Sequence, residues 1–244
     1  MHQFITAYIK SKQSDQSFQD LMFRSLIFQL RHWEPDCTIH VLTNQKVPKF
    51  LGVHEIPTRT WAFNIDKHRC LNLLDQSALF LDYDMILHKP FEQKIFSTNS
   101  EYLLYSPSRI FNYERISKVQ DGSNTKVRQY NSGMIFVNKP SQTLYNKVTN
   151  IHEKYYSDPS TYEHREDDSH WHGSDELALA HYAHITNQSM MPLWEVNLGR
   201  KRLELFKQNY PDKTPQSVHY SHWTKDQYYK KELKNWCQTN DVVF

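Results

Sequence analysis

The stretch Ala78-Leu79-Phe80-Leu81-Asp82-Tyr83-Asp84-Met85-Ile86-Leu87 places two carboxylates directly after an uninterrupted apolar run. The run from Ala78 to Leu81 is too short for a helix and predicts a strand buried on both faces, as in a parallel sheet. Residues two apart in an extended chain point to the same side, so Asp82 and Asp84 would face the space beyond the sheet together. Open α/β sheets bind ligands outside the carboxyl ends of their strands.

Two interpretations of this carboxylate pair follow from the residues alone. Paired hard oxygen donors suit Mg²⁺ or Mn²⁺, especially an ion shared with substrate phosphates. The alternative is that Asp82 and Asp84 are turn residues where a strand leaves the core, because short motifs match by chance often.

The rest of the chain alternates between strand and helix patterns. Period and turn signals predict strands at 4–9, 38–43, 53–56, 101–105 and 133–137, and helices at 17–34, 64–75, 141–156, 174–183, 198–208 and 226–237. Ser17 to Asp20 has the spacing of a capping box. Residues 107–128 and 158–173 read as polar loops. Strand, helix and strand in this order form a βαβ unit, so we expect one α/β domain with an irregular C-terminal third.

Composition excludes several classes of protein. The chain has 244 residues, enough for one large domain, and 29 basic against 27 acidic residues, which gives no electrostatic case for nucleic acid. Among only 5 glycines there is no glycine-rich phosphate loop, so phosphate must be held in another way. The 3 widely spaced cysteines argue against a disulfide framework and a CxxC zinc site. Neither a signal peptide nor a transmembrane segment is evident, so we expect a soluble, cytoplasmic protein.

Four further segments, read in order with the carboxylate pair, carry a family resemblance. They are the opening Phe-Ile-Thr strand with Lys67 after it, Asn131-Ser132-Gly133 before an apolar run, Ser174-Asp175-Glu176 at a helix start, and His219-Tyr220-Ser221-His222-Trp223-Thr224-Lys225. Their order resembles the GT-A glycosyltransferases, and within them family 8, the glycogenin and lipopolysaccharide galactosyltransferase group. The resemblance covers most of the chain, from Phe4 to Lys225.

The resemblance implies a GT-A, Rossmann-like single domain over residues 1–244, with a mostly parallel central sheet flanked by helices. Residues 1–90 would form the nucleotide-binding part, and residues 91–244 would bind the acceptor and complete the metal site. Asp82 and Asp84 match the family's DxD, which holds Mn²⁺ (or Mg²⁺) against a nucleotide diphosphate. His219 matches the third protein ligand of that metal, and imidazole beside carboxylates is sensible for Mn²⁺.

The family pattern also implies roles around the donor substrate. Ala7 and Tyr8 match its uridine pocket, and Lys67 a lysine near the nucleotide. Lys225 matches a lysine that contacts the diphosphate and would offset charge on the leaving UDP. His222 stands where the family has glycine, which removes a close backbone approach to phosphate or replaces it with a side-chain contact.

The donor sugar would lie near three more residues. Asn131 matches the asparagine that approaches the sugar, and Asp175 and Glu176 match the family's Asp-Gln at a helix start. Glu176 departs from the family's glutamine. A carboxylate there would stabilise an oxocarbenium-like transition state or act as a nucleophile.

Each of these residues also has a plain structural interpretation. His219 would be a packed core histidine, and Lys67 and Lys225 would be solvated. Asn131 would enter a turn, and Tyr8 would pack within the sheet. Acids such as Asp175 and Glu176 are favoured in the first turn of any helix.

The function that this reasoning implies is a metal-dependent, retaining transfer of a hexose from a UDP-sugar to an acceptor that the residues do not identify, whether saccharide, protein or lipid-linked. Two alternatives stay open. A nucleotidyltransferase also uses paired carboxylates, but it usually needs the glycine-rich loop that is missing here. A catalytically silent nucleotide-sugar-binding protein would have the same fold.

Overall fold

The fold is taken from a computed structural model, and the description covers most of the chain. The described residues are 1–9, 16–58, 67–97, 99–104, 114–118, 124–128, 132–156, 174–186, 198–199, 203–220 and 225–242.

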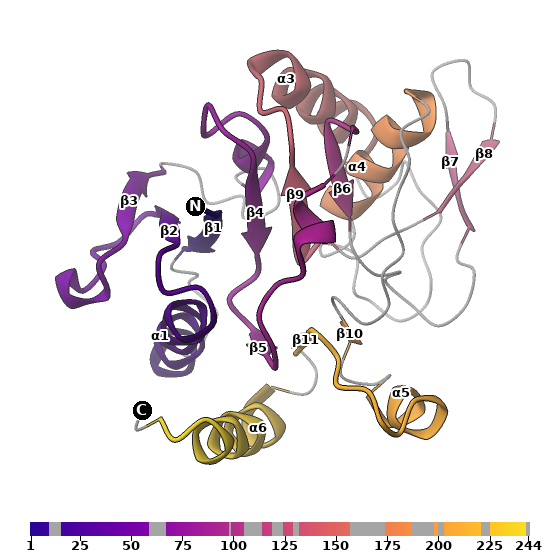
Figure 1. The fold of residues 1–244 in the computed structure, drawn as a ribbon. Helices are drawn as coiled ribbons and strands as arrows, with labels where there is room; N and C mark the ends of the chain where they lie inside the picture. Colours follow the sequence, from indigo (N-terminus) through magenta and orange to yellow (C-terminus); the bar gives the residue numbers. More distant parts are fainter. Residues whose placement is uncertain are drawn as a thin grey trace.

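A six-stranded, mostly parallel sheet forms the centre of the molecule (Figure 1). Its order is β3 (His54–Pro57), β2 (Thr38–Thr43), β1 (Gln3–Tyr8), β4 (Ala78–Leu81), β9 (Met134–Val137) and β6 (Tyr102–Leu104). The first four strands run parallel, whereas β9 is antiparallel to both of its neighbours. All four residues of β4 are buried, as the unbroken apolar run predicts for a strand covered on both faces.

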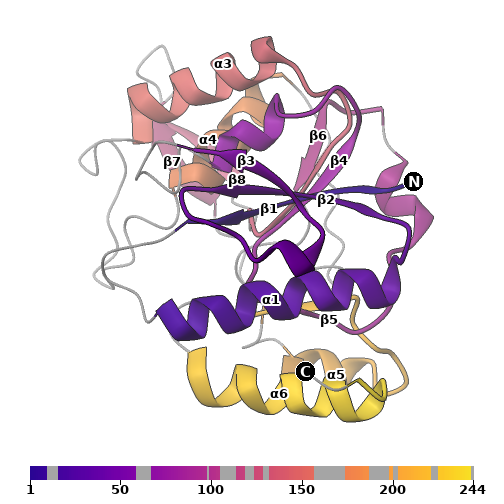
Figure 2. The same ribbon diagram turned by 90° about the vertical axis from the view of Figure 1, so that its left-hand side faces the viewer.

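Helices cover both faces of this sheet. Figures 1 and 2 show α3 and α4 on one face and α1 on the other, with α6 outside α1 and α5 below β10 and β11. Their bounds are α1 (Gln16–Trp33), α3 (Gln142–Ile151), α4 (Ser174–Ile185), α5 (Leu203–Asn209) and α6 (Lys225–Thr239). Short helical turns are η1 (Lys49–Leu51), η2 (His68–Leu71), η3 (Gln93–Phe96) and the π-helical η4 (His152–Tyr156). This is the predicted α/β class with a mostly parallel sheet flanked by helices.

Helix α1 is buried on two sides because it lies between two layers. Phe23, Leu26 and Leu30 pack against the sheet. Phe18 and Met22 pack instead into a cluster with α5 and α6. The C-terminal helices therefore depend on α1 for their own hydrophobic contacts.

A second, three-stranded sheet extends from the carboxylate pair. It consists of β10 (Leu198–Gly199), β11 (Ser217–His219) and β5 (Met85–Leu87), with β11 antiparallel to β5. On the other side of β5, the buried amide of Gln29 accepts a hydrogen bond from the Leu87 backbone N–H at 2.6 Å and donates to Ser25 Oγ at 2.7 Å. Helix α1 thus holds the strand that directly follows Asp84.

Several local expectations differ from the structure near the centre of the chain. Residues 82–84 form a bend and not an extended strand, since the chain leaves one sheet at β4 and enters another at β5. Ser17 lies inside α1, which begins at Gln16, so the capping-box prediction is wrong. The predicted helix at 64–75 does not reach residue 75, because the described part ends as the short turn η2.

Two further differences concern segments with weak hydrophobic patterns. The polar stretch 107–128, predicted as a loop, contains an antiparallel pair, β7 (Glu114–Lys118) and β8 (Asn124–Arg128). Residues Leu198 and Gly199, predicted to begin a helix, pair with β11 instead. The predicted polar loop at 158–173 lies outside the described residues. No helix in the described parts of the chain combines the length and the apolar character needed to span a bilayer.

Candidate active site

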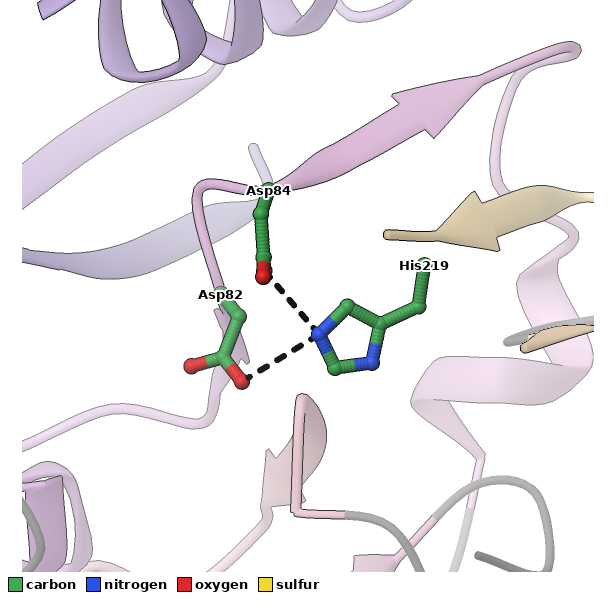
Figure 3. A group of neighbouring side chains, drawn as sticks. All are labelled: Asp82, Asp84 and His219. Carbon is green, nitrogen blue, oxygen red and sulfur yellow. Dashed lines mark ion pairs between the residues drawn. The ribbon is translucent and has the colours of Figure 1, made fainter. Parts of the chain in front are cut away.

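Three potential metal ligands converge at the carboxyl end of β4. Asp82 and Asp84 lie in the bend between β4 and β5, and His219 ends β11. The pairing of His219 with Met85 brings the imidazole alongside the bend, and the Tyr220 N–H donates to the Asp84 carbonyl at 2.9 Å. His219 Nε2 lies 2.9 Å from Asp84 Oδ1 and 3.7 Å from Asp82 Oδ2 (Figure 3).

The electrostatics of this group suit a cation. Burial and the neighbouring charge of Asp84 raise the pKa of Asp82, although Lys67 opposes them. Burial disfavours a charged His219, yet the two carboxylates raise the pKa of its imidazole. One ligand atom from each residue lies within 4.8 Å of the others. Two carboxylates and one imidazole in this arrangement fit Mn²⁺, and fit Mg²⁺ less well.

Lys67 is a buried cation beside this group. Its side chain is 3% exposed, and its Nζ lies 3.0 Å from Asp82 Oδ1 and 3.4 Å from Asp175 Oδ2. Burial works against the charged ammonium, but the carboxylates of Asp82 and Asp175 outweigh it and raise the pKa of Lys67. The alternative of a solvated helix face is therefore wrong for Lys67.

Ser132 links Lys67 to the acids of α4, and the sequence analysis assigned it no role of its own. Its Oγ accepts from Lys67 Nζ at 3.0 Å and donates to Asp175 Oδ2 at 2.5 Å. Its backbone N–H donates to Glu176 Oε1 at 3.2 Å. The sequence offers one indication of its role: Ser132 directly follows Asn131, the residue that the family pattern places near the donor sugar.

Asp175 and Glu176 lie in the first turn of α4, where acids are common, but both are buried. Burial alone would raise the pKa of Asp175, but Lys67 and the Ser132 hydroxyl together lower it. A solvated first turn therefore does not explain these two side chains. The acids join a continuous set of contacts that runs from Asp82 through Lys67 and Ser132.

Two buried histidines, His68 and His152, lie close enough to Asp175 to interact with its charge. His68 Nε2 and His152 Nδ1 are 2.8 Å apart, and both side chains are buried. Burial lowers the pKa of His68 to about 3 and also lowers that of His152. This pair, which the sequence analysis did not single out, therefore adds no positive charge near Asp175 at neutral pH.

The predicted uridine-pocket residues end β1. Ala7 is buried in the core between the sheet and α3 and α4. Tyr8 stacks on Phe23 with ring centroids 4.1 Å apart, and its hydroxyl donates to Asp20. One face of the Tyr8 ring is therefore occupied by α1, in line with the packing interpretation for that face.

Three predicted site residues cannot be placed in this group. Asn131 and His222 lie outside the described residues. Lys225 begins α6, but the position of its side chain lies outside what the structure describes.

In comparisons with known proteins, the chain matches only solved structures. No family model matches the chain, and no curated protein does. The galactosyltransferase LgtC, in complex with donor and acceptor sugar analogues, is 11% identical with a TM-score of 0.63, and the match covers 99% of this chain and 97% of LgtC. The apo form of the glycosyltransferase GlyE from Streptococcus pneumoniae TIGR4 is 13% identical with a TM-score of 0.57, over 99% of this chain.

A third match is the bifunctional glycosyltransferase WbbM, 10% identical with a TM-score of 0.60 over 98% of this chain. The chain spans 60% of GlyE and 51% of WbbM. The chain therefore has the GT-A glycosyltransferase fold. The resemblance expected from the sequence, to GT-A enzymes of the family 8 type, agrees with these neighbours, and at such low identities they define the fold alone.

Proposed function

We propose that the protein is a metal-dependent glycosyltransferase that moves a hexose from a UDP-sugar to an acceptor, with retention of anomeric configuration. The observation that carries the proposal is the convergence of Asp82, Asp84 and His219 from two sheets. A structural role does not require two carboxylates and an imidazole to approach one another at a ligand-binding edge of the sheet. A bound divalent cation would neutralise charge on the diphosphate leaving group.

The neighbouring side chains support a donor sugar site next to the metal ligands. Lys67 bridges Asp82 of the metal group and Asp175 of α4. Asp175 and Glu176 would place negative charge near the anomeric carbon, where positive charge develops as UDP departs. An acceptor hydroxyl attacking from the face that UDP leaves would give retention.

The departure at Glu176 does not remove a contact. Its Oε1 accepts a hydrogen bond from the Ser132 N–H, and the carbonyl oxygen of glutamine would accept the same bond. The family's geometry at this position is thus compatible with either residue. The presence of Glu176 in place of glutamine is therefore not, by itself, a reason to regard the protein as catalytically silent.

The test is calorimetric titration of UDP with Mn²⁺ and, separately, with EDTA. We expect UDP binding that requires Mn²⁺ in the wild type and is lost in Asp84→Ala. Asp36→Ala is the matched control, because Asp36 is an exposed carboxylate just before β2, away from the carboxyl ends of the strands. It should bind UDP as the wild type does.

Turnover is measured next with UDP-glucose and UDP-galactose, as hydrolysis without an acceptor and as transfer in an acceptor screen. UDP release that depends on Mn²⁺ supports the transferase. UDP binding without any turnover identifies the silent nucleotide-sugar-binding protein. An Asp84→Ala variant that binds UDP as tightly as the wild type would overturn the metal assignment.

A further inference from the structure

The Ser132 hydroxyl lies between two opposite charges. Lys67 Nζ is 3.0 Å from its oxygen, and Asp175 Oδ2 is 2.5 Å away. An ammonium group has donors alone, and an ionised carboxylate has acceptors alone. The hydroxyl proton therefore points to Asp175 while its oxygen accepts from Lys67. The short O···O distance is typical of a charge-assisted hydrogen bond.

The backbone of Ser132 holds the second acid. Its N–H donates to Glu176 Oε1 at 3.2 Å, so one residue supplies a donor to each carboxylate of the pair. Ser132 is 3% exposed, and Asp175 and Glu176 are also buried. Water therefore competes little with either hydrogen bond.

Sheet pairing fixes Ser132 relative to the metal group. Leu81 of β4 pairs with Met134 of β9, so the residues just before β9 lie beside those just after β4. The Asp82 N–H donates to the Gly133 carbonyl at 2.8 Å. Ser132 is therefore held next to Asp82 by backbone pairing and contacts α4 with its own donors.

We propose that Ser132 is a positioning residue, which orients Asp175 and Glu176 together and ties them to the strand end that bears the metal ligands. This inference rests on the proposed transferase function. Ser132 acts through the two acids, and its loss would leave the acids present but less well oriented. A loss of orientation lowers turnover more than donor binding.

The first test is the kinetics of Ser132→Ala with Mn²⁺ and UDP-glucose or UDP-galactose, whichever the wild type turns over. We expect kcat to fall about 10- to 100-fold with KM for the donor within about 3-fold of the wild type. The acid limb of the kcat profile should move to higher pH. The Ser132 hydroxyl helps to lower the pKa of Asp175, so without it Asp175 is protonated at a higher pH.

Two variants separate positioning from packing. Ser132→Thr keeps the hydroxyl and should restore both kcat and the acid limb most of the way to wild type. Thr149→Val deletes another buried hydroxyl, on α3, where it donates to the Tyr145 carbonyl at 2.8 Å. This control should leave the pH profile unchanged. Wild-type kcat and an unshifted acid limb in Ser132→Ala would overturn the inference.

A measurement without turnover keeps the two proposals distinguishable. The Asp175 carboxyl is followed by ¹³C NMR titration and assigned by its disappearance in Asp175→Asn. An Asp175 pKa that is higher in Ser132→Ala than in the wild type supports the positioning role, even if no UDP-sugar is turned over and the transferase proposal fails. An equal Asp175 pKa in the two proteins refutes the role, whatever the activity.

Discussion

Lys67 carries its charge where water is nearly excluded, and this makes the residue important for stability as well as for the site. Its ammonium compensates Asp82 and Asp175 at the same time. Burying such a group is costly in itself, so the ion pairs need not add much net stability. Removing the cation while the carboxylates stay buried is strongly destabilising, because the negative charges of Asp82 and Asp175 are then uncompensated.

Lys67→Met keeps the length of the side chain and removes the charge. We expect a loss of about 3 kcal/mol in the free energy of unfolding at pH 7. Asp175 has a folded-state pKa below its unfolded value, so its ionised form stabilises the wild type above that range and loses this contribution as pH falls. In the variant, burial raises the pKa of both carboxyls with no Lys67 ammonium to oppose it, so they take up protons as pH falls and the deficit should be smaller at pH 4. Urea unfolding at both pH values measures the difference.

Lys147→Met is the matched control, because Lys147 is an exposed lysine on α3. Its unfolding free energy should differ little from that of the wild type at either pH. A Lys67→Met deficit of the same size at pH 7 and pH 4 would show that compensation of the carboxylates is not the cause.

At the scale of residues, the sequence indicates which side chains form the candidate site better than it indicates how buried they are and what they contact. Asp82 and Asp84 follow a buried strand so closely that their place at the sheet edge was readable. The burial of Lys67 was not, because it depends on two carboxylates that are distant in sequence. A serine beside a glycine is common in turns, so Ser132 did not stand out. Its hydrogen-bond partners, Lys67 and Asp175, are both distant in sequence.

Among the secondary-structure elements, β5 is short and depends on partners on both sides. It has three residues, paired with β11 along one edge. On the other edge its Leu87 N–H is satisfied by the side chain of Gln29. Because β5 follows Asp84 directly, the position of this carboxylate depends on a contact with α1.

Gln29→Met removes this hydrogen bond while nearly conserving the side-chain volume. We expect a loss of about 1–3 kcal/mol in the free energy of unfolding, since the buried Leu87 N–H loses its acceptor. Calorimetric affinity for Mn²⁺ should also fall, because Asp84 is less firmly placed. Urea unfolding and metal titration of the same protein measure the two effects.

Gln238→Met, at an exposed position near the end of α6, serves as the comparison and should change neither quantity. If Gln29→Met lowered stability but left Mn²⁺ affinity at the wild-type value, the link between α1 and Asp84 would be disproved.

Elements with a strong hydrophobic period were predictable, and those determined by distant partners were not. Strand β2 and the Ser141-capped helix α3 appear where their patterns indicated. The β7 and β8 pair has a polar sequence without a clear alternation. Residues Leu198 and Gly199 are extended because β11 lies beside them, which no local pattern reveals.

At the scale of the whole molecule, the candidate metal ligands Asp82, Asp84 and His219 join two sheets. Asp82 follows β4 of the six-stranded sheet, Asp84 directly precedes β5 of the three-stranded sheet, and His219 ends β11 of that second sheet. The layer of α5 and α6 packs on α1 and carries the second sheet's strand β11 with it. A ligand bound by all three side chains would oppose separation of these layers.

Unfolding should therefore be linked to the metal and the nucleotide. At a concentration of Mn²⁺ and UDP near 100 times their dissociation constant, we expect about 2.7 kcal/mol of added stability. Thermal unfolding measured with and without these ligands, and again after excess EDTA, tests this expectation. The added stability should disappear with EDTA.

His219→Ala is the informative variant here, since it keeps both carboxylates and removes the ligand that β11 contributes. It should retain little of the stabilisation by Mn²⁺ and UDP. An undiminished shift in this variant would mean that the ligands bind without the second sheet.

The pairing of β11 with β5 also has a consequence for biosynthesis. The two aspartates leave the ribosome well before His219, so a nascent chain has carboxylates but lacks the imidazole that completes the group. Competence to hold the metal in this geometry would arise late in translation, when β11 has been made and has docked against a strand formed from the first half of the chain. Tight manganese binding would then mark chains whose C-terminal third has folded.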